Sequence, residues 1–195
     1  MPVYVDHDER RKEILSAAVY VLGEQGLAKF TLRRVGVRLG GSVTLVTHYF
    51  ASREMLLEAI LANALQDAEE ARKKLLDISD PHERLHTAVE YFLPVDRDSI
   101  AIEKARVALS SHINAEPFIK EHLSRIEPEM RAVVKSGIEG FVAPEDLEAT
   151  VDLIRIWTSG MVLTSLEHPE IWTRGRQHQA LQHLTETIRL PSRHA

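Results

Sequence analysis

Apolar residues recur every three to four positions through almost the whole chain, while glycine and proline gather between these stretches. This spacing lines one face of an α-helix with apolar side chains, whereas a β-strand would need strict alternation. The first such stretch runs from about Asp8 to Gln25 and stops at Gly26, a residue type that commonly closes helices. The sequence therefore predicts an all-α protein of about nine helices.

Residues that favour helix N-termini mark several of the expected starts. Thr31 and Ser42 each precede a short apolar stretch, and Ser52 precedes a long one. The last two helices are expected at about residues 144–167 and 173–189. The short helices therefore fall in the first quarter of the chain, and the long ones follow.

The composition excludes several classes of protein. The chain has 195 residues, of which 44% are hydrophobic, and it contains no cysteine. A core of ordinary size can form, whereas disulfides, thiolate metal sites and a cysteine nucleophile are excluded. No apolar stretch approaches the ~20 residues that a membrane-spanning helix needs. We expect a soluble cytoplasmic protein that does not bind membranes.

Charge is distributed unevenly along the chain. The net charge is −5, yet residues 10–53 hold eight basic and only two acidic residues. Residues 54–195 carry an acidic excess. A basic segment on an acidic chain is typical of contact with a polyanion such as DNA, although chance variation in surface charge is the alternative.

The segment from residue 31 to residue 50 reads as two short helices joined by a turn at Gly40, Gly41 and Ser42. Six apolar residues are spaced to share one core: Leu32, Val35, Leu39, Val43, Val46 and Phe50. This pattern predicts a helix-turn-helix, in which the second helix enters the DNA major groove. Four residues of the second helix are expected to face outward and to contact bases or phosphates: Thr44, Thr47, His48 and Tyr49. A helical hairpin in a structural protein is the alternative.

Several strings in residues 9–62 resemble the N-terminal signature of TetR-family transcriptional repressors. They are Thr31-Leu32-Arg33-Arg34-Val35, Leu39-Gly40-Gly41-Ser42 and His48-Tyr49-Phe50-Ala51-Ser52-Arg53-Glu54. The resemblance implies a three-helix DNA-binding domain at residues 1–52 and a helical effector-binding and dimerisation domain at residues 53–195. It also implies a homodimeric repressor that leaves a near-palindromic double-stranded DNA operator when a small-molecule effector binds. Neither catalytic residues nor a cofactor are implied.

The resemblance assigns DNA contacts residue by residue. Thr31 matches the cap of the bracing helix, Ser42 the cap of the recognition helix, and Arg53 a basic position at the start of the fourth helix. The full set of expected DNA-binding residues is Thr31, Arg33, Ser42, Val43, Thr44, Thr47, His48, Tyr49 and Arg53. Val43 stands where the family commonly has lysine, so we expect base recognition to depend on methyl contacts.

The helix expected near residues 147–166 has two apolar faces. Such a helix is buried on two sides, either by a partner subunit or inside a monomeric bundle. The resemblance favours the dimer, because the last two helices of the family usually form an intersubunit bundle. The expected interface residues are Leu153, Ile156, Gly160, Leu163, Leu181, Leu184 and Ile188.

The later part of the chain is similar to the sensor half of betaine-repressor-like members, around residues 102–118 and 157–161. Candidate residues for an apolar effector pocket are Phe92, Arg106, Leu109, His112, Phe118, Trp157 and Met161. Core packing is the alternative for each of them.

The string His82-Glu83-Arg84-Leu85-His86 matches the His-Glu-x-x-His pattern of zinc hydrolases. Its position in the first turn of an expected helix, with no third ligand nearby, leads us to expect no metal site. A zinc hydrolase and a helical protein-binding adaptor remain the alternatives to a DNA-binding regulator.

Overall fold

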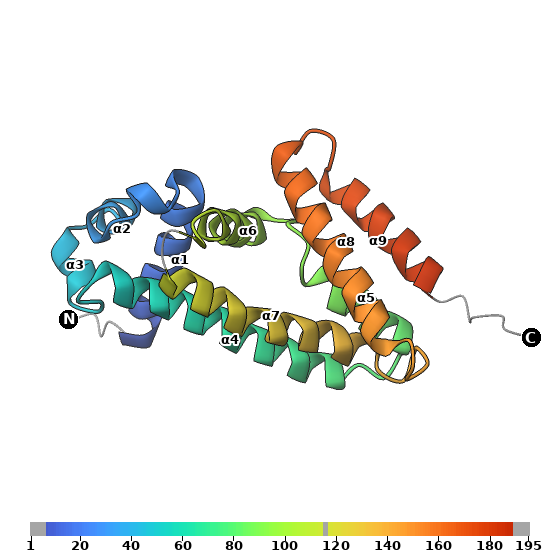
Figure 1. Cartoon of the computed structure of the whole chain (residues 1–195). Coiled ribbons are helices and arrows are strands. Elements are labelled where there is room, and N and C mark those ends of the chain that lie inside the picture. The colour runs from blue at the N-terminus through green and yellow to red at the C-terminus, as the bar shows by residue number, and fades with distance from the viewer. Residues whose placement is uncertain (1–6, 115–116, 189–195) are drawn as a thin grey trace, which may run out of the picture. The chain divides into compact units, whose positions relative to one another are not determined.

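The computed structural model describes residues 7–114 and 117–188, and over these residues the chain is α-helical (Figure 1). The nine helices of this described part are α1 (His7–Gln25), α2 (Leu32–Arg38), α3 (Val43–Thr47), α4 (Arg53–Leu76), α5 (Pro81–Glu90), α6 (Arg97–Ser110), α7 (Pro117–Ile138), α8 (Leu147–Glu167) and α9 (Arg174–Ile188). A 3₁₀ turn, η1 (Leu27–Lys29), lies between α1 and α2. The predicted all-α class is confirmed. Arg189, the predicted end of the last helix, lies outside the described residues.

The chain divides into two compact units, which do not follow a single cut in the sequence. The first contains residues 1–64 and 101–123, and the second contains residues 65–100 and 124–195. Three helices, α4, α6 and α7, therefore contribute residues to both units. The predicted functional boundary at residue 52 is a different kind of division and stays a prediction.

The core of the first unit forms around α1. Its apolar stripe is buried as its spacing predicts, and it is joined by side chains from the helix-turn-helix and from α4. The largest buried side chains of this core include Ile14, Leu22, Leu27, Phe30, Phe50, Leu56 and Leu57. Gly23 brings α1 against α6, because a Cβ at this position would lie 2.9 Å from the carbonyl oxygen of Ala101. Burial of these side chains holds the short helices α2 and α3, which are too short to be stable alone.

The second unit has its own continuous core, to which α5, α7, α8 and α9 contribute. Buried members include Leu85, Val133, Ile154 and Leu181. The carboxylate of Asp80 accepts a 2.7 Å hydrogen bond from the backbone N–H of His82 and caps α5. No helix among the described residues has the length and hydropathy needed to cross a membrane.

Helix α8 presents one buried and one exposed apolar face, as its sequence predicts. Six residues form the buried face: Val151, Ile154, Thr158, Met161, Val162 and Ser165. On the other side Leu153 is 53% exposed, Ile156 71% and Leu163 45%. Four ion pairs connect α8 with α7, among them Lys135 with Glu148 at 2.9 Å. The exposed apolar face is thus the side of α8 that its own unit leaves open.

Candidate nucleic-acid interface

Helices α2 and α3 form the predicted helix-turn-helix, and local sequence explains its geometry. The Thr31 hydroxyl accepts a hydrogen bond from the backbone N–H of Arg34 at 3.3 Å, which confirms it as the cap of α2. Gly40 has φ +69°, a conformation that residues with a Cβ rarely adopt, so the turn requires glycine there. Ser42 occupies the N-cap position of α3 but makes no capping hydrogen bond through its side chain. Its exposed hydroxyl is therefore not engaged in capping.

The two helices approach closely at Gly36. A Cβ at this position would lie 2.8 Å from the Ser42 carbonyl oxygen and 3.2 Å from the Val43 nitrogen. Because Gly36 has no side chain, the start of α3 can lie this close to α2. Val43 itself is 40% exposed, so its predicted place in the shared core is wrong, while Val35 and Val46 are fully buried there.

The outer face of α3 carries small side chains. Thr44 and Thr47 are exposed, and the Thr47 hydroxyl donates to the Thr44 carbonyl at 3.2 Å. This hydrogen bond occupies the hydroxyl proton, which leaves methyl contacts and acceptor lone pairs for a base edge. The surface that α3 offers is accordingly apolar around Val43, as its composition predicts.

Two aromatic rings follow α3, and a third ring joins them from α1. His48 and Tyr49 meet edge to face with ring centroids 5.2 Å apart. The His7 ring lies 5.7 Å from Tyr49 and 6.2 Å from His48. His7 was not among the predicted DNA-binding residues, because its position, 41 residues before His48, gives no sequence signal of this contact. The cluster ties the start of α1 to the end of the recognition helix.

Arg33 and Arg53, both expected to bind DNA, occupy different environments. Arg33 is exposed and has no hydrogen bond or ion pair with any other described residue. Arg53 is 28% exposed and donates to the backbone carbonyls of Phe30 and Leu27, each at 3.2 Å. Arg53 thus holds the segment before α2 against the start of α4. Its DNA contact stays a prediction, and this geometry gives Arg53 a structural role as well.

Glu54 lies beside Arg53 in the first turn of α4. Hydrogen bonds from its own backbone N–H and from the Ser52 hydroxyl lower the pKa of this carboxyl group, and the charge of Arg53 adds to the effect. The carboxylate is therefore ionised at neutral pH at the positive end of the helix dipole, where a negative charge is favourable.

Replacing Arg53 by alanine is expected to lower the free energy of unfolding by about 1–3 kcal/mol, because two charge-assisted hydrogen bonds disappear. Thermal unfolding followed by circular dichroism measures this decrease. The matched variant Arg33→Ala should unfold at the wild-type temperature, since Arg33 has no partner among the described residues. Equal melting temperatures for Arg53→Ala and the wild type would contradict the structural role.

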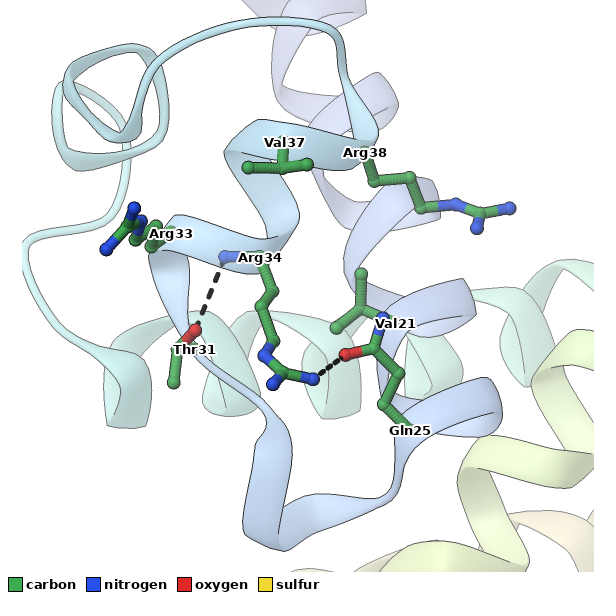
Figure 2. Close-up of a pocket in the computed structure, with 7 residues that line it drawn as sticks. All are labelled: Val21, Gln25, Thr31, Arg33, Arg34, Val37 and Arg38. Atoms are coloured by element: carbon green, nitrogen blue, oxygen red, sulfur yellow. Dashed lines mark hydrogen bonds between the residues drawn. The ribbon is translucent and has the colours of Figure 1, made fainter.

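An open groove of about 510 Å³ lies between the C-terminal half of α1 and α2 (Figure 2). We call it the α1–α2 groove, and its lining residues are Val21, Gln25, Thr31, Arg33, Arg34, Val37 and Arg38. The Arg34 guanidinium donates to the side-chain oxygen of Gln25 (Figure 2). Arg34 and Arg38 were not predicted as functional residues. The basic excess of this segment is the signal that could have found them.

The predicted effector-pocket residues are divided between the two units. Four of them belong to the first unit: Arg106, Leu109, His112 and Phe118. Phe92, Trp157 and Met161 belong to the second, where Phe92 and Met161 are buried in the core. The effector pocket stays a prediction.

The predicted dimer residues of α8 are exposed, and a Cβ on Gly160 would meet no atom within 4 Å. On α9, Leu181 is fully buried in the core of its own unit, while Leu184 and Ile188 pack against that core. Leu181 therefore has no exposed surface that a partner could contact, and its predicted place in the interface is wrong. The other positions stay predictions.

His82 and His86 of the zinc-hydrolase pattern lie on α5. The His82 ring packs edge-on against Phe141 at 5.1 Å, and His86 Nδ1 lies 3.8 Å from a carboxylate oxygen of Glu90. Among the described residues, no group of three or more histidine or acidic side chains is arranged to hold a metal.

Residues 14–60 match the model of the family described as bacterial regulatory proteins, tetR family. These residues include all of α2 and α3, the turn between them and most of α1. The helix-turn-helix segment of this chain is therefore similar to that of the TetR family. The matched segment is the one whose geometry is described above, so the resemblance found in the sequence is confirmed.

A relative of this chain is the HTH-type transcriptional regulator BetI of Paraburkholderia phytofirmans, which is 29% identical over 119 residues. The match covers 60% of this chain and 61% of the relative, so the chain spans about three-fifths of the relative's length. Two solved structures share its fold. A transcriptional regulator from Rhodococcus has a TM-score of 0.75, 20% identity, and coverage of 91% of this chain and 95% of its own. A putative transcriptional regulator from Saccharomonospora viridis in complex with choline has a TM-score of 0.76, 18% identity, and coverage of 92% and 97%.

Proposed function

We propose that this chain is a homodimeric TetR-family transcriptional repressor, and not an enzyme, that binds a near-palindromic DNA operator in the cytoplasm. A small-molecule effector would release it from that operator. The observation that carries the proposal is the helix-turn-helix inside the family-matched segment. Its surface holds Arg33, which has no partner among the described residues, and the exposed Thr44 and Thr47. A cation without a protein partner is available to a phosphate, and exposed threonines are available to bases.

Substitutions on α2 and α3 should separate general affinity from base preference. Arg33→Ala should weaken binding to all duplexes similarly and reduce the slope of log K against log[salt] by ~0.9 for each phosphate that the side chain no longer neutralises. Thr44→Ala and Thr47→Ala should instead change the ranking of operator variants, at a cost of about 1–3 kcal/mol at the base pair concerned.

Fluorescence anisotropy with a panel of single-base operator variants measures both effects. The operator for the panel comes from selection of random-sequence DNA by the purified chain. An unchanged ranking for both threonine variants would contradict the proposed orientation of α3 in the major groove.

Dimerisation is proposed on the exposed apolar face of α8. Leu153, Ile156, Gly160 and Leu163 follow one another at helical spacing and are all exposed, although they are apolar or lack a side chain. Apolar side chains gathered on one exposed stripe favour a protein partner. A twofold axis there would present two recognition helices to half-sites about 34–36 Å apart.

The effector is proposed to act through α4, which runs from the helix-turn-helix unit into the second unit. A ligand that shifts this helix would move the recognition helices apart and so misplace the phosphate contacts. By linkage, operator DNA must then weaken effector binding by the same factor, typically about 5–150-fold. Choline is a reasonable first compound to test, because a structure of the same fold was solved with it.

A further inference from the structure

We propose that the α1–α2 groove binds a backbone phosphate of the DNA that flanks each half-site on its outer side. This inference rests on the proposed DNA-binding function and extends its footprint beyond the bases that α3 reads. The residues that carry it are Arg34 and Arg38, which lie in the basic segment but are not among the individually expected DNA-binding residues.

Arg34 is exposed and is oriented by a neutral partner. One guanidinium nitrogen donates to the Gln25 side-chain oxygen, as the dashed line in Figure 2 shows. A guanidinium has five N–H donors, so this single bond leaves most of them available. Because the amide of Gln25 carries no charge, it fixes the direction of Arg34 without neutralising it. A pre-oriented and uncompensated cation is well suited to a phosphate.

Arg38 lines the same groove but is partly neutralised. It forms a 3.0 Å ion pair with Glu24 of α1 and lies 4.3 Å from the centre of the Tyr20 ring. These contacts hold its position and reduce its net charge. We therefore assign the main phosphate contact to Arg34, and a weaker contribution to Arg38.

The groove also has an apolar part that suits a nucleic-acid backbone. Val21 and Val37 both line it, and Val37 is 68% exposed, although valine is usually buried. Sugar carbons adjoin each phosphate of DNA, so they can cover Val37 when the phosphate meets Arg34. A free inorganic anion would leave this valine exposed.

The groove shares two residues with the predicted DNA interface. Thr31 and Arg33, both expected to bind DNA, belong to its lining. A DNA strand bound at Thr31 and Arg33 would therefore border this groove. This continuity favours DNA over an unrelated anion as the occupant.

Two operator duplexes test the proposal. They carry the same selected half-sites, but one ends at their outer edges and the other continues for about half a helical turn at each end. Arg34→Gln should reduce the salt slope on the extended duplex by ~0.9 per subunit and leave the slope on the short duplex unchanged. Arg34→Lys should keep most of the slope, because it retains the charge. Glu24→Gln should tighten binding to the extended duplex alone, a gain that misfolding cannot produce.

Lys73→Gln removes the same charge from an exposed site in the second unit and should change neither slope. An Arg34→Gln effect that is equal on both duplexes, or absent from both, would overturn the proposal. Calorimetry with inorganic phosphate tests whether the groove binds a free anion instead of a DNA phosphate. Arg34-dependent phosphate binding, combined with no effect of flank length, would assign the groove to a free anion and would also overturn it. Failure of the proposed DNA-binding function would give a different result. The affinity of Arg33→Ala would then equal that of the wild type on both duplexes.

Discussion

Replacing Gly160 by arginine is expected to produce a folded monomer that binds operator DNA about 10²–10⁴-fold more weakly than the wild type, because two linked half-site contacts become one. No atom lies within 4 Å of a Cβ at this position, so the subunit itself has room for the new side chain. Arginine also has a higher helix propensity than glycine, which favours α8 by up to ~1 kcal/mol. A dimer, however, would have to bury the guanidinium in an apolar contact.

Sedimentation velocity measures the assembly, and circular dichroism checks the fold of the same sample. Gly175→Arg is the matched control, because Gly175 is also a helical glycine with open space around its Cβ position. It lies in the first turn of α9, where the helical period puts it on the opposite side of this helix from the predicted interface residue Leu184, and the variant should remain a dimer. A dimeric Gly160→Arg variant would place the interface elsewhere.

Replacing Gly137 by alanine is expected to lower the free energy of unfolding by about 1–3 kcal/mol through overpacking. Gly137 lies on α7, where a Cβ would overlap the Cβ of Ala88 on α5 and lie 3.4 Å from the Arg84 carbonyl oxygen. Ala88 is fully buried, so neither helix can adapt by turning a side chain into solvent.

The double variant Gly137→Ala with Ala88→Gly restores one methyl group to this contact and keeps the helix propensities in balance. Its stability should therefore return most of the way to that of the wild type. Urea unfolding of the wild type, both single variants and the double variant gives the coupling free energy directly. Additive single effects would show that the two helices are not in contact at these residues.

The helices could be predicted from the sequence because their signals are local. The cap at Thr31, the glycine turn at residue 40 and the two faces of α8 each depend on residues a few positions apart. Packing between segments that are far apart in the sequence was harder to predict. Val43 fits the spacing of a core residue, yet the close approach at Gly36 brings the start of α3 to α2 and leaves Val43 at the surface.

In the candidate DNA-binding site, too, local features could be predicted from the sequence, whereas contacts between distant residues could not. Arg33 and Arg53 look equivalent in the sequence, since both are basic residues in the matched segment. Only the fold brings the carbonyls of Leu27 and Phe30, more than 20 residues earlier, to the Arg53 guanidinium. The α1–α2 groove likewise depends on contact between two helices. Its charge was visible as a basic excess, whereas its shape was not.

The most direct test of DNA recognition is the salt dependence of binding between the purified chain and its selected operator. Log K should fall linearly with log[salt], with a slope of ~0.9 for each phosphate contact, and binding to operator should exceed binding to random duplex of equal length. The slope should be shallower for Arg33→Ala and unchanged for Lys73→Gln. No sequence-selective duplex retained at any salt concentration, or an affinity for DNA that does not change with salt, would contradict the account.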